Sequence, residues 1–305
     1  MHKKAHLSGV IFATTFGLTF MFSKTALEYI TPIGLIAYRF LLAFLVFESL
    51  RRFKLIKVRF TRNTVKALFL VALFQPVAYF LFETYGLHMT TSAEAGMMIA
   101  LIPIFVIVLS TLILKEKPRL IQLFFIALSV SGVLVIQVFQ AIGAIEPQFI
   151  GYILLLLAVL SAAAYNIASR YASKLGAKSA EVTYFMMLVG AVSFNIIYII
   201  QLFLGEGATY YIQHLSRIEL VLPILYLGIV ASIGGFFLLN YALSQLEAHV
   251  ISIYANIATI VAILAGAIFL DEILELQHYI GAVMIIIGVY GTIRTNKNPK
   301  LRTIK

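Results

Sequence analysis

The chain carries an internal repeat, and this repeat constrains its fold more than any other feature. Residues 80–137 align with residues 236–293 at one constant offset, without a gap. The identical pairs run through the whole alignment: Phe80 and Phe236, Tyr85 and Tyr241, Leu87 and Leu243, Leu114 and Leu270, Glu116 and Glu272, Leu120 and Leu276, Gly132 and Gly288, and Val133 and Val289. A unit with an odd number of membrane spans inserts its second copy upside down. Such inverted repeats are typical of secondary transporters.

Composition indicates a membrane protein and excludes several kinds of chemistry. Of the 305 residues, 62% are hydrophobic and only 12% are charged, and the mean hydropathy is +1.00. Soluble domains do not reach these values. The absence of cysteine excludes disulfides and thiolate-bound metals. No GxxxxGK[ST] phosphate-binding sequence occurs, so we expect no ATPase activity in the chain itself. We expect no cofactor and no metal site.

Apolar runs of about 20 residues, the length that spans a bilayer, recur along the chain. The first lacks a cleavage site for a signal peptide, and we interpret it as a retained span. The predicted spans are 7–27, 32–50, 66–87, 93–114, 119–138, 148–172, 181–204, 220–244, 249–270 and 276–294. The predicted fold is therefore an all-α polytopic membrane protein with ten transmembrane helices in two inverted five-helix repeats.

The positions of the basic residues predict the orientation. With the N-terminus in the cytoplasm, every lysine and arginine lies on the cytoplasmic side except Lys24, Arg39 and Arg217. This distribution follows the positive-inside rule and indicates that both termini are cytoplasmic. It also explains the net charge of +10 without a nucleic-acid partner. We interpret the basic loop 51–66 as a topology signal, with binding of anionic headgroups as the alternative.

The predicted spans divide the chain into two repeats and a tail. The first five-helix repeat covers residues 1–140, the second covers 148–294, and residues 295–305 form a basic cytoplasmic tail. Because the second repeat is inverted, Glu116 and its counterpart Glu272 are expected at opposite membrane faces.

Several short motifs resemble those of the EamA family of ten-helix carriers, in the drug/metabolite transporter superfamily. The resemblance extends over about residues 7–294, and the residues that carry it are Ser23-Lys24, Pro32, Arg39-Phe40, Thr90-Thr91-Ser92-Ala93, Pro103, Glu116 and Gly132, with Glu272 and Gly288 in the second copy. Two features depart from the family pattern: Thr259 takes the place that Pro103 has in the first copy, and the first helix has no tryptophan. The resemblance implies a carrier with ten helices.

Polar residues within the spans are the candidates for transport, because each is costly in a bilayer unless paired or solvated. Glu83 stands out, with Tyr79 one turn before it on the same side of the helix. Glu83 could form an anionic wall of the substrate site or titrate with protons. It could equally be a fixed partner of Lys24 or Arg39, and we leave both readings open.

We divide the remaining candidates into two groups. The residues expected to bind substrate are Glu83, Tyr79, Gln75, Tyr165, Asn166, Asn240, Tyr241, Tyr254, Asn256 and Lys24. The residues expected to be structural or to form gates are Arg39, Glu94, Pro103, Glu116 and Glu272. For single amide residues, packing between helices is the alternative. A site rich in tyrosines and amides suits small zwitterions or aromatic metabolites.

The leading hypothesis is a secondary transporter that exports small metabolites, in particular amino acids or related compounds, as its two five-helix halves rock. Efflux of cationic drugs is the alternative, and it would make Glu83 central. A membrane-embedded enzyme is a remote alternative, because the histidines are scattered and neither H-E-x-x-H nor G-x-S-x-G occurs. We expect a monomer in the cytoplasmic membrane of a prokaryote. Protons are a candidate coupling ion, and facilitated diffusion and exchange are left open.

Overall fold

Long apolar helices make up the regular structure of the described part of the chain. The structure is a computed structural model that describes residues 2–89, 98, 101–141, 149–205, 210–215, 217–269 and 276–295. The helices of the first half are α1 (His2–Leu27), α2 (Pro32–Arg52), α3 (Arg62–Ala72), η1 (Leu73–Ala78), α4 (Tyr79–Met89), α6 (Ile102–Leu109), η2 (Ser110–Leu114) and α7 (Leu120–Ala141). Those of the second half are α8 (Phe149–Lys174), α9 (Ser179–Leu204), α10 (Tyr210–Leu215), α11 (Ile218–Leu225), η3 (Tyr226–Gly235), α12 (Phe236–Gln245), α13 (Ala248–Ser252), α14 (Ala255–Phe269) and α15 (Leu276–Thr295).

Within the described residues, eight helical segments are long and apolar enough to cross a membrane. They are Lys3–Leu27, Pro32–Arg52, Arg62–Gly86, Phe149–Lys174, Ser179–Leu204, Ile218–Gln245, Ala248–Phe269 and Leu276–Thr295. Two further apolar helices, Ile102–Leu114 and Leu120–Val135, are shorter in the part described. The protein is thus an all-helical polytopic membrane protein, as the sequence predicts.

Two of the long helices are interrupted. Between α3 and α4, Gln75 adopts an extended backbone (φ −149°, ψ 117°), followed by Pro76. Proline has no N–H to donate and clashes with the preceding turn, so it breaks the helix there. The second break was not expected: residues 249–270 were predicted as one helix, but Ile253 and Tyr254 form a turn between α13 and α14.

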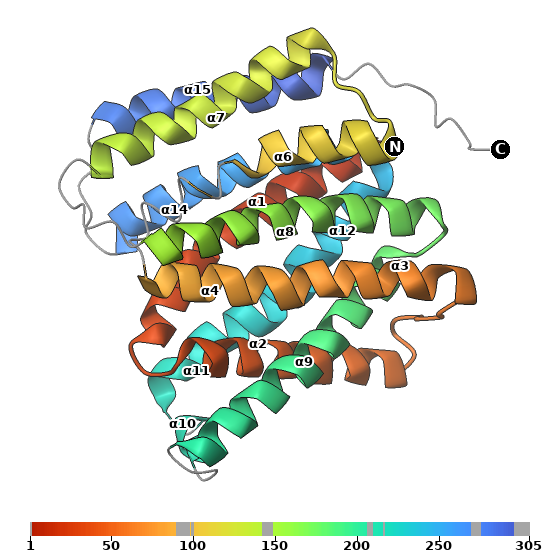
Figure 1. Cartoon of the computed structure of the whole chain (residues 1–305), viewed down its shortest axis with the longest axis vertical. Helices are drawn as coiled ribbons and strands as arrows, with labels where there is room; N and C mark the ends of the chain where they lie inside the picture. Colours follow the sequence, from red (N-terminus) through yellow and green to blue (C-terminus); the bar gives the residue numbers. More distant parts are fainter. Residues whose placement is uncertain are drawn as a thin grey trace.

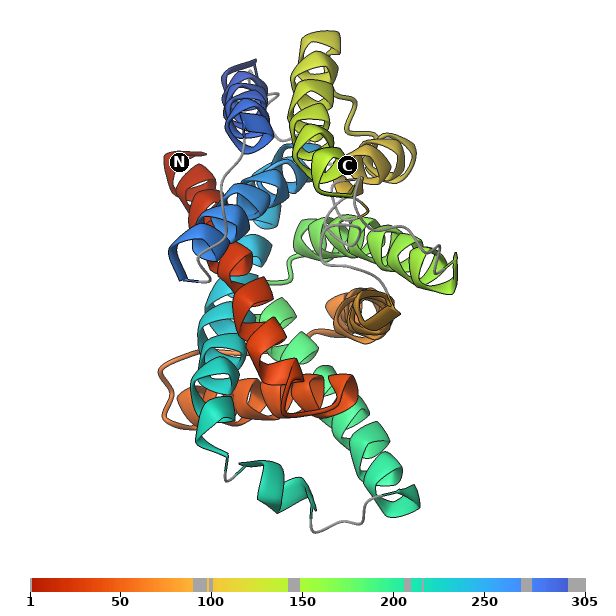
Figure 2. The same ribbon diagram turned by 90° about the vertical axis from the view of Figure 1, so that its left-hand side faces the viewer.

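The helices of the two halves are interleaved in space (Figure 1). Helix α1 packs against η3, α12 and α14 of the second half, and α8, which opens the second half, packs against α3, α4 and α6 of the first. In addition, α2 packs against α9, and α7 lies alongside α15, as Figures 1 and 2 both show. These contacts are reciprocal. The contacts of α1 with the second half correspond to those of α8 with the first half, and the pairs α2–α9 and α7–α15 each join two corresponding helices.

Individual residues show the same reciprocity. Gly132 on α7 lies against the backbone of Gly281 and Ile285 on α15. Its repeat counterpart Gly288 lies against the backbone of Phe125 and Ser129, the residues that the repeat offset pairs with Gly281 and Ile285. A Cβ on Gly288 would lie 2.5 Å from the Phe125 carbonyl oxygen, so glycine is required for this close approach.

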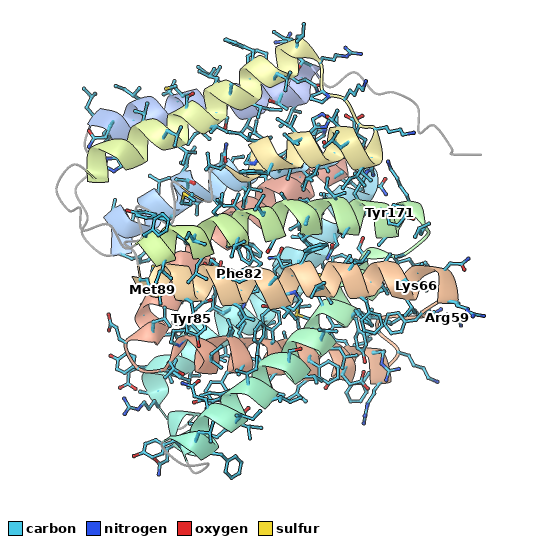
Figure 3. All side chains as sticks on the ribbon, in the orientation of Figure 1. Arg59, Lys66, Phe82, Tyr85, Met89 and Tyr171 are labelled. Carbon is cyan, nitrogen blue, oxygen red and sulfur yellow. The ribbon has the colours of Figure 1, made fainter. Side chains whose placement is uncertain are left out.

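Basic residues gather at one end of the helical bundle. Figure 3 places Arg59, Lys66 and Tyr171 at one end and Met89 at the other, and the N-terminus in Figure 1 lies at the same end as Lys66. We refer to the end with Arg59 and Lys66 as the basic end. It also carries the C-terminal turn of α8, which contains Lys174.

Candidate functional site

Arg39 is a buried arginine in the middle of the apolar helix α2. Its side chain is held on two sides: Nε donates a hydrogen bond to Ser232 Oγ of η3 (2.7 Å), and the guanidinium lies over the Phe80 ring, 4.7 Å from its centroid. The residue is only 4% exposed, yet its buried Nη2 has no hydrogen-bond partner among the described residues. A buried cationic donor without a partner is costly, so Nη2 is suited to donate to an acceptor group of a ligand.

Glu83 on α4 lies close enough to Arg39 for electrostatic interaction, as does Tyr79 one turn before it. The described side chains of Arg39 and Glu83 form no direct ion pair. The Glu83 carboxylate accepts a hydrogen bond from the Thr84 hydroxyl (3.2 Å) and is only partly buried. An acidic and a basic group thus face the same region without contacting each other.

Tyr226 also borders this charged region, whereas Gln75 is buried at the break between α3 and α4 and has no described contact with Arg39 or Glu83. Tyr226 of η3 lies within electrostatic range of Arg39, stacks on Phe22 of α1 with ring centroids 4.2 Å apart, and donates to the Thr15 carbonyl. The region therefore lies where α1, α2, α4 and η3 meet, and we call Arg39, Glu83 and Tyr79 the charged site.

A second group of predicted residues forms a buried hydrogen-bond network. Asn240 of α12 accepts from the Tyr165 hydroxyl (2.9 Å) and the Ser169 hydroxyl (2.6 Å), both on α8. Its amide nitrogen donates to Thr183 Oγ1 of α9 (3.1 Å). All four residues are buried. Because the polar atoms satisfy one another, this network joins three helices and leaves little capacity for a ligand.

Aromatic side chains connect the charged site with this network. Phe80, on which Arg39 lies, contacts its repeat counterpart Phe236 with ring centroids 6.3 Å apart. Phe236 in turn contacts Tyr165 at 6.3 Å and Phe16 at 5.1 Å. These contacts form a continuous chain of buried or partly buried rings that leads from Arg39 to Tyr165.

The remaining predicted residues that the structure describes make their contacts outside the charged site. Tyr254 and Asn256 are buried beside the turn between α13 and α14, and their partners are His6 Nδ1 (2.7 Å) and Ser129 Oγ (3.1 Å) respectively. Asn166 is buried on α8 and donates to the Ala162 carbonyl. The other placements are brief: Tyr241 is partly buried on α12, Pro103 is buried at the start of α6, and the Lys24 side chain, Glu94 and Glu272 lie outside the described residues.

Glu116 belongs to a buried ion cluster at the basic end. Its carboxylate pairs with Arg170 Nε (3.0 Å) and Lys174 Nζ (2.9 Å), and it accepts from the Ala248 N–H at the start of α13 (3.1 Å). Arg170 also donates to the carbonyls of Leu243 and Ser244. The cluster joins the first half to the second.

The charges of this cluster shift the pKa values of its two carboxyl groups, Glu116 and Glu247, in opposite directions. Burial raises the pKa of Glu116, but Arg170, Lys174 and the Ala248 N–H outweigh it, so that its pKa lies below the usual range. Burial, together with the charge of Glu116, raises the pKa of the neighbouring Glu247. At neutral pH the described cluster thus keeps Glu116 ionised between two cations.

Sequence reasoning missed several of these residues. Ser232, Ser169 and Thr183 are small hydroxyl residues whose partners depend on helix rotation, and no sequence signal marks them. Arg170 is different, because Ser169-Arg170 repeats the Ser23-Lys24 pair of the first helix. That local repeat could have identified it. Among the described residues, no cluster of histidine and carboxylate side chains is suited to bind a metal.

Comparison with known proteins gives the family. A sequence model of the EamA-like transporter family matches residues 3–138 and, separately, residues 149–294. The chain belongs to the EamA-like transporter family. It is therefore a membrane transporter, which is not an enzyme, and its substrate is expected to be a small molecule bound within the bilayer.

Relatives cover almost the whole chain. "Uncharacterized transporter YcxC" of Bacillus subtilis (strain 168) is 36% identical and covers 94% of this chain and 92% of its own length. A "Probable amino-acid metabolite efflux pump" of Escherichia coli (strain K12) is 25% identical, over 95% of each chain. One crystal structure matches with a TM-score of 0.78 at 17% identity, covering 95% of this chain and 96% of that one, and it shows the same fold.

Proposed function

We propose that this EamA-family protein exports small metabolites, in particular amino acids or related compounds, by alternating access across the cytoplasmic membrane of a prokaryote. The observation that carries the proposal is the charged site. A buried arginine with an unpartnered nitrogen, near a carboxylate, lies within apolar helices, where ionisable groups are rare and commonly mark a transport pathway. The amino-acid efflux pumps among the relatives support the substrate class.

The proposed architecture is ten spans in two inverted repeats, 1–140 and 148–294, with both termini and the tail 295–305 in the cytoplasm. The two ranges matched by the family model and the reciprocal contacts of Gly132 and Gly288 support it. Alternating access in such proteins exchanges the conformations of two related units. Because α1 packs on α12 and α14, and α8 on α4 and α6, we expect the moving units to contain helices from both halves.

The Glu116 cluster supports closure at the basic end, because it joins the first half to the second through Arg170, Lys174 and the Ala248 N–H. If the basic end is cytoplasmic, the structure corresponds to a state closed toward the cytoplasm. We propose Glu116 as part of that closure, and we expect the transporter to act as a monomer, since ten helices can enclose a pathway alone.

Flux from proteoliposomes tests the function. Vesicles with and without the protein are loaded with a labelled mixture of amino acids and with a cationic dye. Selective loss of amino acids only when protein is present is the expected result. Movement of the dye alone would contradict the proposal and favour efflux of cationic compounds. The Glu83 carboxylate is the observation that supports this alternative. Repeating the assay with and without a pH gradient tests coupling to protons.

A further inference from the structure

We propose that Arg39 and Glu83 bind the two charges of a zwitterionic substrate: Arg39 Nη2 donates to its carboxylate and Glu83 accepts from its ammonium group. This assignment rests on the proposed transport function and names the substrate class for it. Arg39 thereby becomes a binding residue, whereas its sequence context suggested a structural one.

The geometry of Arg39 prepares one donor for an anion. Ser232 holds Nε, and the ring of Phe80 covers one face of the guanidinium, so the orientation of the planar group is fixed. Nη2 is then left buried and without a partner among the described residues. Arginine suits carboxylates because its donors are directional and permanently charged. A carboxylate at Nη2 would satisfy both its hydrogen-bonding capacity and its charge.

Glu83 restricts the ligand to one that also carries a positive charge. A simple anion at Arg39 would be repelled by Glu83, and a simple cation at Glu83 would be repelled by Arg39, in surroundings where such charges are poorly screened. A zwitterion avoids both repulsions. The charged groups of an α-amino acid are attached to the same carbon, so they can reach two protein charges that lie near each other without touching.

The acidic residue of the charged site is not duplicated. The repeat offset pairs Glu83 with Leu239. Duplicated residues such as Phe80 and Phe236 pack against each other in the core. Residues that differ between the two copies do not take part in this packing between duplicated residues. A single charged site is consistent with one substrate molecule per transport cycle.

Competition by analogues that lack one charge tests the assignment on the wild-type protein. Proteoliposomes carry the labelled amino-acid mixture, and the competitors are unlabelled amino acids, their amides without a carboxylate, and their N-acetyl derivatives without an ammonium group. We expect both analogue classes to compete at least tenfold more weakly than the amino acids, which corresponds to about 1.4 kcal/mol or more for each charge.

Two variants then assign the charges to residues. Arg39→Gln should lower amino-acid flux at least tenfold and remove the preference of amino acids over amides. Glu83→Gln should remove the preference of amino acids over N-acetyl derivatives. Arg52→Gln is the matched control, because it removes the same charge from α2 at an exposed position, and it should leave flux and selectivity unchanged. Thermal unfolding of each purified variant checks that it is folded. If Arg39→Gln does not fold, the competition assay on the wild-type protein tests the assignment instead.

The outcomes separate this assignment from the proposed function. If the wild type transports amino acids but all three competitor classes act equally, the assignment is wrong while metabolite transport stands. Variants that reduce flux without changing selectivity would also overturn it. If the wild type transports no amino acid and moves only the dye, the proposed function and this assignment both fail.

Discussion

Asn240 shows how a single residue joins three helices. Its side-chain oxygen accepts from Tyr165 and Ser169, and its nitrogen donates to Thr183. Replacing it with leucine removes the acceptor of the buried Tyr165 and Ser169 hydroxyl groups, whereas Thr183 keeps its bond to the Ser179 carbonyl. Each such group costs about 1–3 kcal/mol in proteins generally, and the cost within membranes averages nearer 0.6 kcal/mol per bond.

We therefore expect Asn240→Leu to lower the thermal unfolding temperature of the detergent-solubilised protein clearly. The neighbouring variant Tyr241→Phe keeps the aromatic ring and should change the unfolding temperature little. Equal unfolding temperatures for Asn240→Leu and the wild type would mean that the network carries no stability.

At the residue scale, the sequence predicts which side chains are polar and buried, but not which of them meet. The sequence predicts that Glu83 and Tyr79 share a helix face, and it offers Arg39 as a candidate partner of Glu83. Tyr165 and Asn240 were expected at the substrate site, whereas the structure joins them to each other. Helical periodicity gives the face of a residue, but the rotation and tilt of a membrane helix depend on packing against its neighbours.

The pair of helices α7 and α15 depends on glycine at its crossing point. We expect Gly288→Ala to destabilise the protein by about 1–3 kcal/mol, since its Cβ would meet the backbone of Phe125 and force the helices apart. Gly234→Ala is the control, because the nearest atom to its Cβ is 3.9 Å away, and should stay within about 0.5 kcal/mol of wild type. Unfolding in denaturing detergent measures both variants.

The loop between η2 and α7 stabilises the fold through Glu116 in a pH-dependent way. The folded protein holds the pKa of the Glu116 carboxyl below its unfolded value of about 4.3. The contribution of this carboxylate to the free energy of unfolding is therefore complete above the unfolded pKa. It is lost as the pH falls through the lower pKa of the folded state. Removing one partner of a buried ion pair costs about 3 kcal/mol.

Glu116→Gln should therefore be less stable than wild type at pH 7, and the difference should shrink as the pH falls below about 4. Unfolding measured across this pH range tests the expectation. A difference that is the same at every pH would show that packing around residue 116, and not its charge, is responsible.

At the element scale, the family and the helical nature of the protein were predicted from sequence and are confirmed. The break at Gln75–Pro76 could be foreseen from the proline, whereas the turn at Ile253–Tyr254 has neither proline nor glycine to mark it. At that turn Tyr254 forms a hydrogen bond with His6 of α1, a contact between residues far apart in the sequence. Local sequence cannot supply such information.

For the whole molecule, the orientation can be tested directly because the chain has no cysteine. Lys57→Cys and Arg217→Cys place single thiols at exposed positions. A membrane-impermeant maleimide should label Arg217→Cys in intact cells, and Lys57→Cys only in inside-out vesicles. Labelling of both from the same side would contradict the proposed ten-span topology.

The presence of Glu83 in one half and Leu239 at the matching position of the other has a consequence for the resting protein. A carrier built from two identical halves would have inward- and outward-facing forms of equal free energy. Here the two forms are chemically different, so one should predominate when no substrate is bound. The gradient still sets the direction of net flux, but half-saturation should occur at different substrate concentrations on the two sides of the membrane.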